Sequence, residues 1–240
     1  MKGKLLSLAA VAALAIGFAS SGAHALSAKF AASWSNEVKI VHAYVDDGTA
    51  SACLADGTGT GTDGDPCVLA EALLTTIDVA QQKDLLIGVS GQIGLHTFTQ
   101  AKGKGGSSTQ LGEAKAVGSV VVTLELREAG TSNFVQTAAP GPVIFAARLQ
   151  ELKVAVADSD MEDLTEVIVS LLLQTTAAHH FNFIGVDLDQ GVYDVVAIFN
   201  LSAWVAIVGE DAIAEAIVTL GPRMVTAKEV RTAKNTLVKF

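Results

Sequence analysis

The sequence predicts an all-β protein, an antiparallel β-sandwich or jelly roll with one or two short helices. Three observations lead to this prediction. Apolar residues recur at every second position through most of the chain after Val38, turn-forming clusters separate these stretches, and helical periodicity is sparse. Several short strands joined by tight turns are typical of sandwiches and jelly rolls.

The alternating stretches follow one another along the chain, and the clearest is Ser119–Glu128. There Val120, Val122, Leu124 and Leu126 alternate with Val121, Thr123, Glu125 and Arg127. Only a strand places the first set on one face. Similar sets are Val38, Ile40, His42 and Tyr44; Leu85, Ile87 and Val89; and Val143, Phe145, Ala147 and Leu149 followed by Leu152, Val154 and Val156. The last set changes face, which predicts a bulge near Gln150. Leu164–Thr176 and Gly191–Trp204 supply two further strands, joined through His180–Gln190.

Turns, helices and loops are expected between these strands. Turn clusters lie at Asp46–Gly48, Glu128–Gly130, Ala139–Pro142 and Asp189–Gly191. Cys67–Val79 and Asp211–Leu220 are the two expected short helices, although both stretches also fit strands. Ala55–Pro66 and Ala101–Gly112 are rich in Gly, Ser and Thr and are expected to be mobile loops. No repeat or composition break divides the chain, so residues 26–240 are expected to form a single domain.

The N-terminus has the pattern of a secretory signal peptide over Met1–Ala25. Lys2 and Lys4 precede an apolar run, and Ala23-His24-Ala25 forms an A-x-A cleavage site. The run is shorter than the ~20 residues that a bilayer-spanning helix requires. Val195–Gly209, the longest later apolar stretch, is also too short and too polar to span. We therefore expect an extracytoplasmic protein, periplasmic, surface-bound or secreted, with no transmembrane helix in its mature chain.

The charge of the chain argues against nucleic acid as a partner. The formal net charge is −9, and removal of the two lysines of the signal peptide makes it −11. Nucleic-acid binding requires a basic patch that releases counterions, and no such cluster exists beyond Lys102-Gly103-Lys104.

Cys53 and Cys67, the only two cysteines, are expected to form a disulfide, because an even pair in an exported protein is most simply bonded. The loop between them contains three carboxylates, Asp56, Asp63 and Asp65. Calcium binds six to eight hard oxygens, so this loop is a candidate calcium site. It matches neither the EF-hand loop nor the Gly-Gly-x-Gly-x-Asp repeat, however, and a solvated, disulfide-closed loop without metal is the preferred interpretation.

No motif in the sequence predicts catalysis or a bound cofactor. Gly88–Gln92 is close to a nucleophile elbow, but the second glycine is replaced by Gln92 and the surrounding pattern is that of a strand. His179 and His180 are adjacent on an expected strand, so their side chains point to opposite faces and cannot easily share a metal ion. We therefore expect neither catalytic nor cofactor-binding residues and no enzymatic activity.

Tyr193 is expected to have a structural role. It follows the turn Asp189-Gln190-Gly191 and begins an alternating strand, which is the placement of a tyrosine that hydrogen-bonds back across a sandwich corner. His180-Phe181-Asn182-Phe183 precedes it and Val225–Arg231 follows. In this combination, residues 164–231 resemble secreted bacterial β-sandwich domains of jelly-roll type that have no assigned function. The resemblance implies a fold and no catalytic residue.

These observations together favour an exported, non-catalytic β-sandwich that acts as a structural or interaction module on the cell surface or in the extracellular matrix. Its partners would be surface or matrix proteins or glycans, and the sequence does not define an oligomeric state. One alternative is a calcium-assisted module that binds carbohydrate or another ligand through residues 55–66. Another is an outer-membrane β-barrel, suggested by the terminal Phe240. Aromatic residues make up only 5% of the chain, too few for two interfacial girdles.

Overall fold

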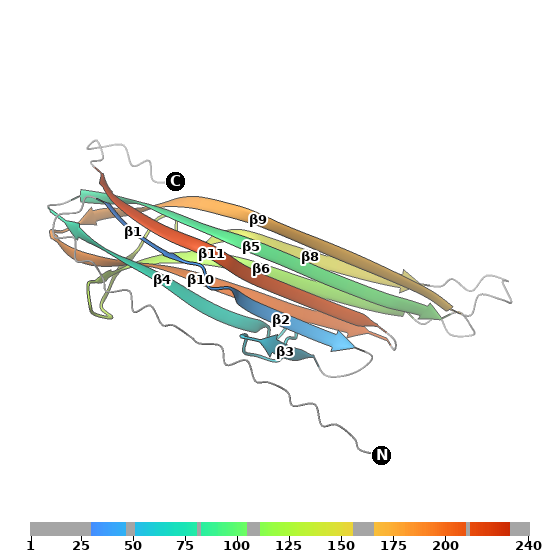
Figure 1. Cartoon of the computed structure of the whole chain (residues 1–240). Coiled ribbons are helices and arrows are strands. Elements are labelled where there is room, and N and C mark those ends of the chain that lie inside the picture. Colours follow the sequence, from blue (N-terminus) through green and yellow to red (C-terminus); the bar gives the residue numbers. More distant parts are fainter. Residues whose placement is uncertain are drawn as a thin grey trace, which may run out of the picture.

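The structure is a computed structural model that describes residues 30–46, 51–80, 83–104, 111–155, 166–209 and 212–230. The expected signal peptide, Met1–Ala25, lies outside these residues. Two antiparallel sheets pack face to face to form an elongated β-sandwich (Figure 1). The described residues contain no helix, and so none that is long and apolar enough to cross a membrane.

Sheet A contains six strands in the order β3-β2-β11-β5-β9, with β1 beside β11 where β2 ends. Their bounds are β1 Phe30–Ser35, β2 Lys39–Asp46, β3 Ala52–Ala55, β5 Lys83–Lys104, β9 Glu166–Leu188 and β11 Ile213–Val230. Sheet B has the order β4-β10-β6-β7, and β8 also pairs with β6. Its strands are β4 Cys67–Val79, β6 Leu111–Glu128, β7 Phe134–Thr137, β8 Val143–Ala155 and β10 Gly191–Val208.

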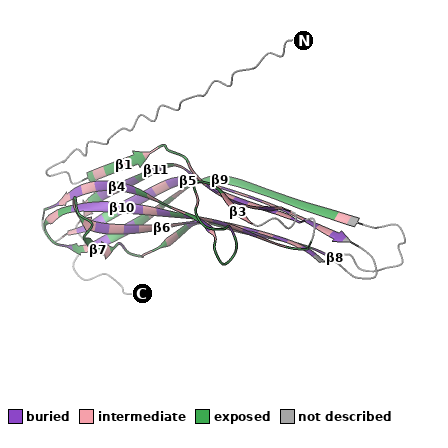
Figure 2. Cartoon of the chain, turned by 90° about the horizontal axis from the view of Figure 1, so that it is seen from below, coloured by how far each residue is buried: buried purple, intermediate pink, exposed green. Residues whose placement is uncertain are grey.

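The core lies between the sheets and is formed by every second residue of each strand. The prediction for Ser119–Glu128 is confirmed, because Val120, Val122, Leu124 and Leu126 of β6 are all fully buried. The set Leu85, Ile87 and Val89 of β5 is buried in the same way. Figure 2 shows the resulting alternation of burial along the strands. The period of two therefore determines which residues form the core.

The two expected helices are wrong, since Cys67–Val79 is strand β4 and Asp211–Leu220 falls largely within β11. Alanine and leucine favour helices as isolated residues, but pairing overrides this weak preference. The thirteen residues of β4 pair without interruption with β10, from Cys67–Ala203 to Val79–Gly191. Val218 and Leu220 of β11 are buried between the sheets.

Three finer expectations also need correction. In β2 the core-facing residues are Val41, Ala43 and Val45, so the face predicted from Ile40, His42 and Tyr44 is the outer one. The face of β8 changes at Phe145, opposite Val120 and Val121, and not near Gln150. Residues 101–104 and 111–112 of the expected second loop continue β5 and β6, and His180–Leu188 continues β9.

The Cys53–Cys67 disulfide is present and connects the two sheets. Cys53 lies on β3 in sheet A and Cys67 on β4 in sheet B, with 5.5 Å between their Cα atoms. A disulfide is typical of proteins that fold in an oxidising compartment, which fits an extracytoplasmic location. The bond closes one side of the sandwich.

Removing this disulfide is expected to lower stability without changing the fold. On the chain-entropy account, the disulfide closes a loop between positions 53 and 67 and so lowers the entropy of the unfolded chain. This stabilises the folded protein by roughly 3 kcal/mol. The double variant Cys53→Ala/Cys67→Ala should therefore lose about 3 kcal/mol in urea unfolding. Its far-ultraviolet circular dichroism should match that of the parent protein. A much smaller loss would mean that residues 51–67 retain their structure in the unfolded chain.

Polar side chains close both sides of the sandwich. On the disulfide side, Arg223 of β11 donates from Nη2 to Glu71 Oε1 of β4 at 2.6 Å and from Nη1 to the Glu37 carbonyl at 2.7 Å. On the opposite side, Gln150 of β8 receives a hydrogen bond from Thr97 at 2.6 Å and donates to Thr99 at 2.8 Å. The core therefore contains paired polar groups at its two margins.

Candidate functional site

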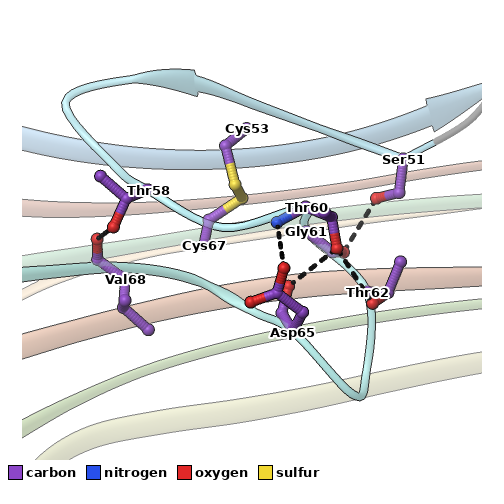
Figure 3. The surroundings of a disulfide bond; sticks show 9 residues. All are labelled: Ser51, Cys53, Thr58, Thr60, Gly61, Thr62, Asp65, Cys67 and Val68. Atoms are coloured by element: carbon purple, nitrogen blue, oxygen red, sulfur yellow. Dashed lines mark hydrogen bonds between the residues drawn. A yellow bond between two sulfur atoms is a disulfide. The ribbon is translucent and has the colours of Figure 1, made fainter.

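The loop between Cys53 and Cys67 is organised by its own hydrogen bonds (Figure 3). Asp65 is the centre of this arrangement, because its side chain accepts from the Thr60 amide at 3.0 Å and its carbonyl accepts from the amide of Gly61 at 2.9 Å. Gly59 has a φ of 115°, and a Cβ there would lie 2.2 Å from the Pro66 carbonyl oxygen. The loop conformation thus depends on glycine at this position.

The three carboxylates considered for calcium have different environments. The Asp65 carboxylate points into the loop and accepts from the Thr60 amide. Asp56 lies at the edge of sheet A, where its backbone amide donates to the Ile40 carbonyl at 3.1 Å. Asp56, Asp63 and Asp65 do not converge as a ligand set, and within the described ranges no group of three or more His, Cys, Asp or Glu side chains is arranged to hold a metal ion. Asp65 therefore serves as a structural residue of the loop.

Two histidines and a glutamate meet on the outer face of sheet A, which sequence reasoning missed. His42 of β2 and His96 of β5 flank Glu215 of β11, with Nε2–Oε distances of 2.8 and 3.5 Å. The closer contact lacks hydrogen-bond geometry, since His42 Nε2 has no hydrogen-bond partner. Both histidines occupy positions opposite Ile217 in the sheet register. This histidine–glutamate cluster is partly exposed and carries a charge that depends on histidine protonation.

A shallow depression of about 210 Å³ lies beside this cluster on the same face. Its floor is Gly94 of β5, and its walls include His96, Gln174, Thr176 and Thr219. A Cβ at position 94 would lie 2.3 Å from Thr219 Oγ1, so only glycine leaves the depression open. Leu95 and Ile217 complete the lining, so the depression combines hydroxyl and amide groups with apolar surface, as many small-ligand sites do.

The other sequence candidates for chemistry lie in ordinary strand positions. Ser90, in the stretch that resembles a nucleophile elbow, is an internal residue of β5 paired with β9 and β11. His179 contacts the ring of Phe145, with centroids 6.2 Å apart, and His180 Nε2 lies 3.1 Å from Asn182 Oδ1. The neighbouring histidines thus have separate surroundings.

Tyr193 lies at a corner of the sandwich with its ring buried. Its hydroxyl donates to the carbonyl of Asp189 at 3.0 Å, across the turn that joins β9 to β10. Burial raises the pKa of the phenol, and the negative charges of Asp189 and Glu128 act in the same direction. The hydroxyl therefore bonds the backbone of the preceding turn, as in a tyrosine corner.

Tyr193→Phe is expected to lower the free energy of unfolding by about 0.5–1.5 kcal/mol, because the ring stays buried and one hydrogen bond is lost. Chemical denaturation followed by tryptophan fluorescence measures this loss. Thr131→Val, which removes a hydroxyl that bonds the Glu128 carbonyl at an exposed turn, provides a control. An unchanged stability in Tyr193→Phe would show that the corner bond contributes nothing.

Both tyrosines of the chain are expected to ionise above their usual pKa near 10. Burial is the main cause for each, and Tyr44 also donates to Asp46 at 3.0 Å. A raised pKa in the folded state stabilises the protein fully below the unfolded pKa, and this stabilisation is lost as pH rises through the folded pKa. A phenolate absorbance titration should therefore give a higher midpoint for native than for urea-unfolded protein.

The outer face of sheet B carries a group of exposed apolar side chains, here called the sheet B band, with Ser119, Ser202 and Asn200 between them. Register places its residues side by side across four strands: Trp204 beside Val117, Val117 beside Leu149, and Val121 beside Ile144. Ile144 is 67% and Leu149 60% exposed. Val68 and Leu74 of β4 and Ile198 of β10 extend the band.

Ion pairs border the sheet B band at both ends. Arg127 donates to Glu125 at 2.7 Å at one end, and Lys153 lies 2.8 Å from Glu151 and 3.4 Å from Glu113 at the other. A hydrogen bond from the Lys153 ammonium lowers the pKa of the Glu151 carboxyl. Opposite charges are therefore paired at both borders of the band, and Lys115 lies 4.9 Å from the ring centroid of Trp204 within it.

A comparison with protein-family models gave no match for this chain, and no curated protein sequence was found to be similar to it.

Proposed function

We propose that the protein is an exported, non-catalytic interaction module that acts at the cell surface or in the extracellular matrix. The sheet B band is the observation that carries this proposal. A sandwich in water normally presents polar residues on its outer faces, whereas large exposed apolar patches bordered by polar residues mark interaction sites.

The charges of the chain indicate which partner the band fits. The protein is acidic overall, with a formal net charge of −9, whereas the only charged side chain over the band, among the described residues, is Lys115, whose ammonium lies 4.9 Å from the ring centroid of Trp204. A strongly charged partner would find few opposite charges on the band to pair with. The partner is therefore a protein with a flat, weakly charged surface, as expected of a matrix or envelope component.

Cell fractionation of the native host tests this function. The wild-type protein should sediment with washed cells or matrix, and Ile144→Glu/Leu149→Glu should be released into the medium. Both side chains are more than half exposed, so the double variant is expected to keep its thermal midpoint. Leu86→Glu/Met224→Glu is the matched control, because these two residues are exposed on sheet A.

Release of the sheet B variant alone, with an unchanged thermal midpoint, supports the proposal. A wild-type protein that is found only as free protein in the medium contradicts it. Equal release of the two double variants also contradicts it, since the effect would then follow from added charge and not from the band.

The depression above Gly94 supports a second candidate function, the binding of a small neutral polyhydroxylated ligand such as a sugar. Gln174, Thr176 and Thr219 offer both donors and acceptors there. Isothermal calorimetry with neutral oligosaccharides measures such binding. Gly94→Ala should abolish it, because the added Cβ competes with Thr219 for the same space.

A further inference from the structure

Strand β9 forms one edge of sheet A and is open along most of its length. It pairs with β5 without a register shift from Gly185 to Glu166. On its other side, the described part of the chain contributes a single bridge, between Ala139 and Ile184. Figure 2 shows the long exposed half of this strand, and Figure 1 shows it at the margin of the sandwich.

The bridge to Ala139 shows which backbone groups face this edge. The Ile184 amide donates to the Ala139 carbonyl at 2.9 Å, and the Ala139 amide donates to the Ile184 carbonyl at 2.8 Å. In an antiparallel strand, alternate residues direct both backbone groups to the same side. Because the register with β5 is unbroken, the even-numbered residues from Ile168 to Asn182 direct their amides and carbonyls to the open edge.

Residues 167–173 of β9 are apolar except for Ser170, and most of them are exposed, on both faces of the strand. Ile168 and Leu172 on the outer face are 55% and 57% exposed. Val169, Leu171 and Leu173 face sheet B and are still 39–42% exposed. They remain exposed because polar side chains from β8 bridge the sheets here: Arg148 donates to Thr175 Oγ1 at 2.7 Å and Gln150 to the Leu171 carbonyl at 2.6 Å.

The open edge also lacks the features that usually prevent strand addition. Residues 167–178 contain no charged residue and no proline. In contrast, β8 carries Arg148, Glu151 and Lys153, and the opposite edge of sheet A consists of the short strands β1 and β3. Short edge strands and edge charges are the ordinary protection against edge-to-edge pairing, and an exposed, long, apolar edge is a site of association.

We propose that β9 pairs with β9 of a second copy of this chain, antiparallel and about a two-fold axis normal to the sheet. A second copy fits this edge because residues 167–178 are uncharged, so the same stretch of two acidic chains can pair with itself without bringing like charges together. With this axis, the outer faces of the two sheets lie on the same side of the joined sheet, and so do their core-facing sides. Leu171 and Leu173 of both copies therefore lie on the core-facing side. Even-numbered residues of both strands supply the hydrogen bonds between the copies. The two-fold axis then passes next to Leu172 or Leu173, so that each of these residues lies opposite or close to its own copy.

Analytical ultracentrifugation of the oxidised, exported chain over a concentration series tests the dimer. The wild-type protein should form a discrete dimer, and Leu172→Lys should weaken it by about tenfold or more, because ammonium groups are brought together across the new pair. Met224→Lys is the matched control on the same outer face, since Met224 lies on β11 and is 41% exposed. Circular dichroism verifies that each variant is folded.

Two further variants test the mode of pairing independently of added charge. Leu172→Pro removes an amide that faces the open edge, so it should keep the fold and abolish the dimer. Leu172→Cys or Leu173→Cys should form a disulfide-linked dimer on mild oxidation, whereas Met224→Cys should not. A wild-type monomer at all concentrations, an open-ended polymer, or a dimer that persists in folded Leu172→Lys and Leu172→Pro would overturn the proposal.

Discussion

Val122→Asp is expected to lower the free energy of unfolding by more than about 4 kcal/mol, enough to leave most of the protein unfolded. Val122 of β6 is fully buried between the sheets, beside Phe199 of β10. A carboxylate there loses its hydration and gains no partner. Urea unfolding followed by circular dichroism measures the loss. If the variant is already unfolded without urea, the curve has no folded baseline.

Thr123→Asp provides the matched control, because the neighbouring side chain points to the outer face of the same strand. Its expected cost is within about 0.5 kcal/mol, as for other surface substitutions. Similar losses at the two positions would contradict the assignment of opposite faces to Val122 and Thr123. The comparison therefore tests the alternation of β6 directly.

Glu71→Ala is expected to lower the free energy of unfolding by about 3 kcal/mol, because it leaves the Arg223 guanidinium without its carboxylate. The Arg223 side chain is 1% exposed and its Nη2 lies 2.6 Å from Glu71 Oε1. Arg223 Nε already has no hydrogen-bond partner, so the charge depends on Glu71 and on the Glu37 carbonyl. Thermal and urea unfolding both measure the effect.

Two variants separate this effect from the loss of any ion pair. Glu151→Ala removes an exposed partner of Lys153 and should lower the stability much less than Glu71→Ala does. Glu71→Ala/Arg223→Met should recover part of the stability, since no buried charge remains. A double variant that is less stable than Glu71→Ala would show that Arg223 stabilises the sandwich through other contacts.

The sequence predicted the fold class because alternation is a local property. In Ser119–Glu128 the apolar and polar sets differ clearly, so the buried face is evident from the residues alone. In Cys67–Val79 leucine occurs on both faces, so the alternation is weak, and the pairing with β10 makes the segment a strand. In β2 the set Ile40, His42 and Tyr44 alternates as regularly as the set Val41, Ala43 and Val45, and the structure shows that the second set faces the core.

The surfaces that carry the functional proposals were less accessible to sequence reasoning. His42, His96 and Glu215 are far apart in the chain, and they meet because β2 and β5 both pair with β11. The sheet B band likewise depends on the register of four strands. Cys53 and Cys67 were the exception, since the chain has only two cysteines and their pairing needs no knowledge of the fold.

The position of β11 has a consequence for the order of folding. Among the described residues, the last strand, β11, lies between β5 on one side and the first strands, β1 and β2, on the other. Sheet A therefore lacks its central strand until residues 213–230 have been synthesised. Folds dominated by such distant pairings form slowly, because the loops between partners must close first. β1 and β2 remain without their main partner until then, so sheet A is expected to form only after residues 213–230 are available.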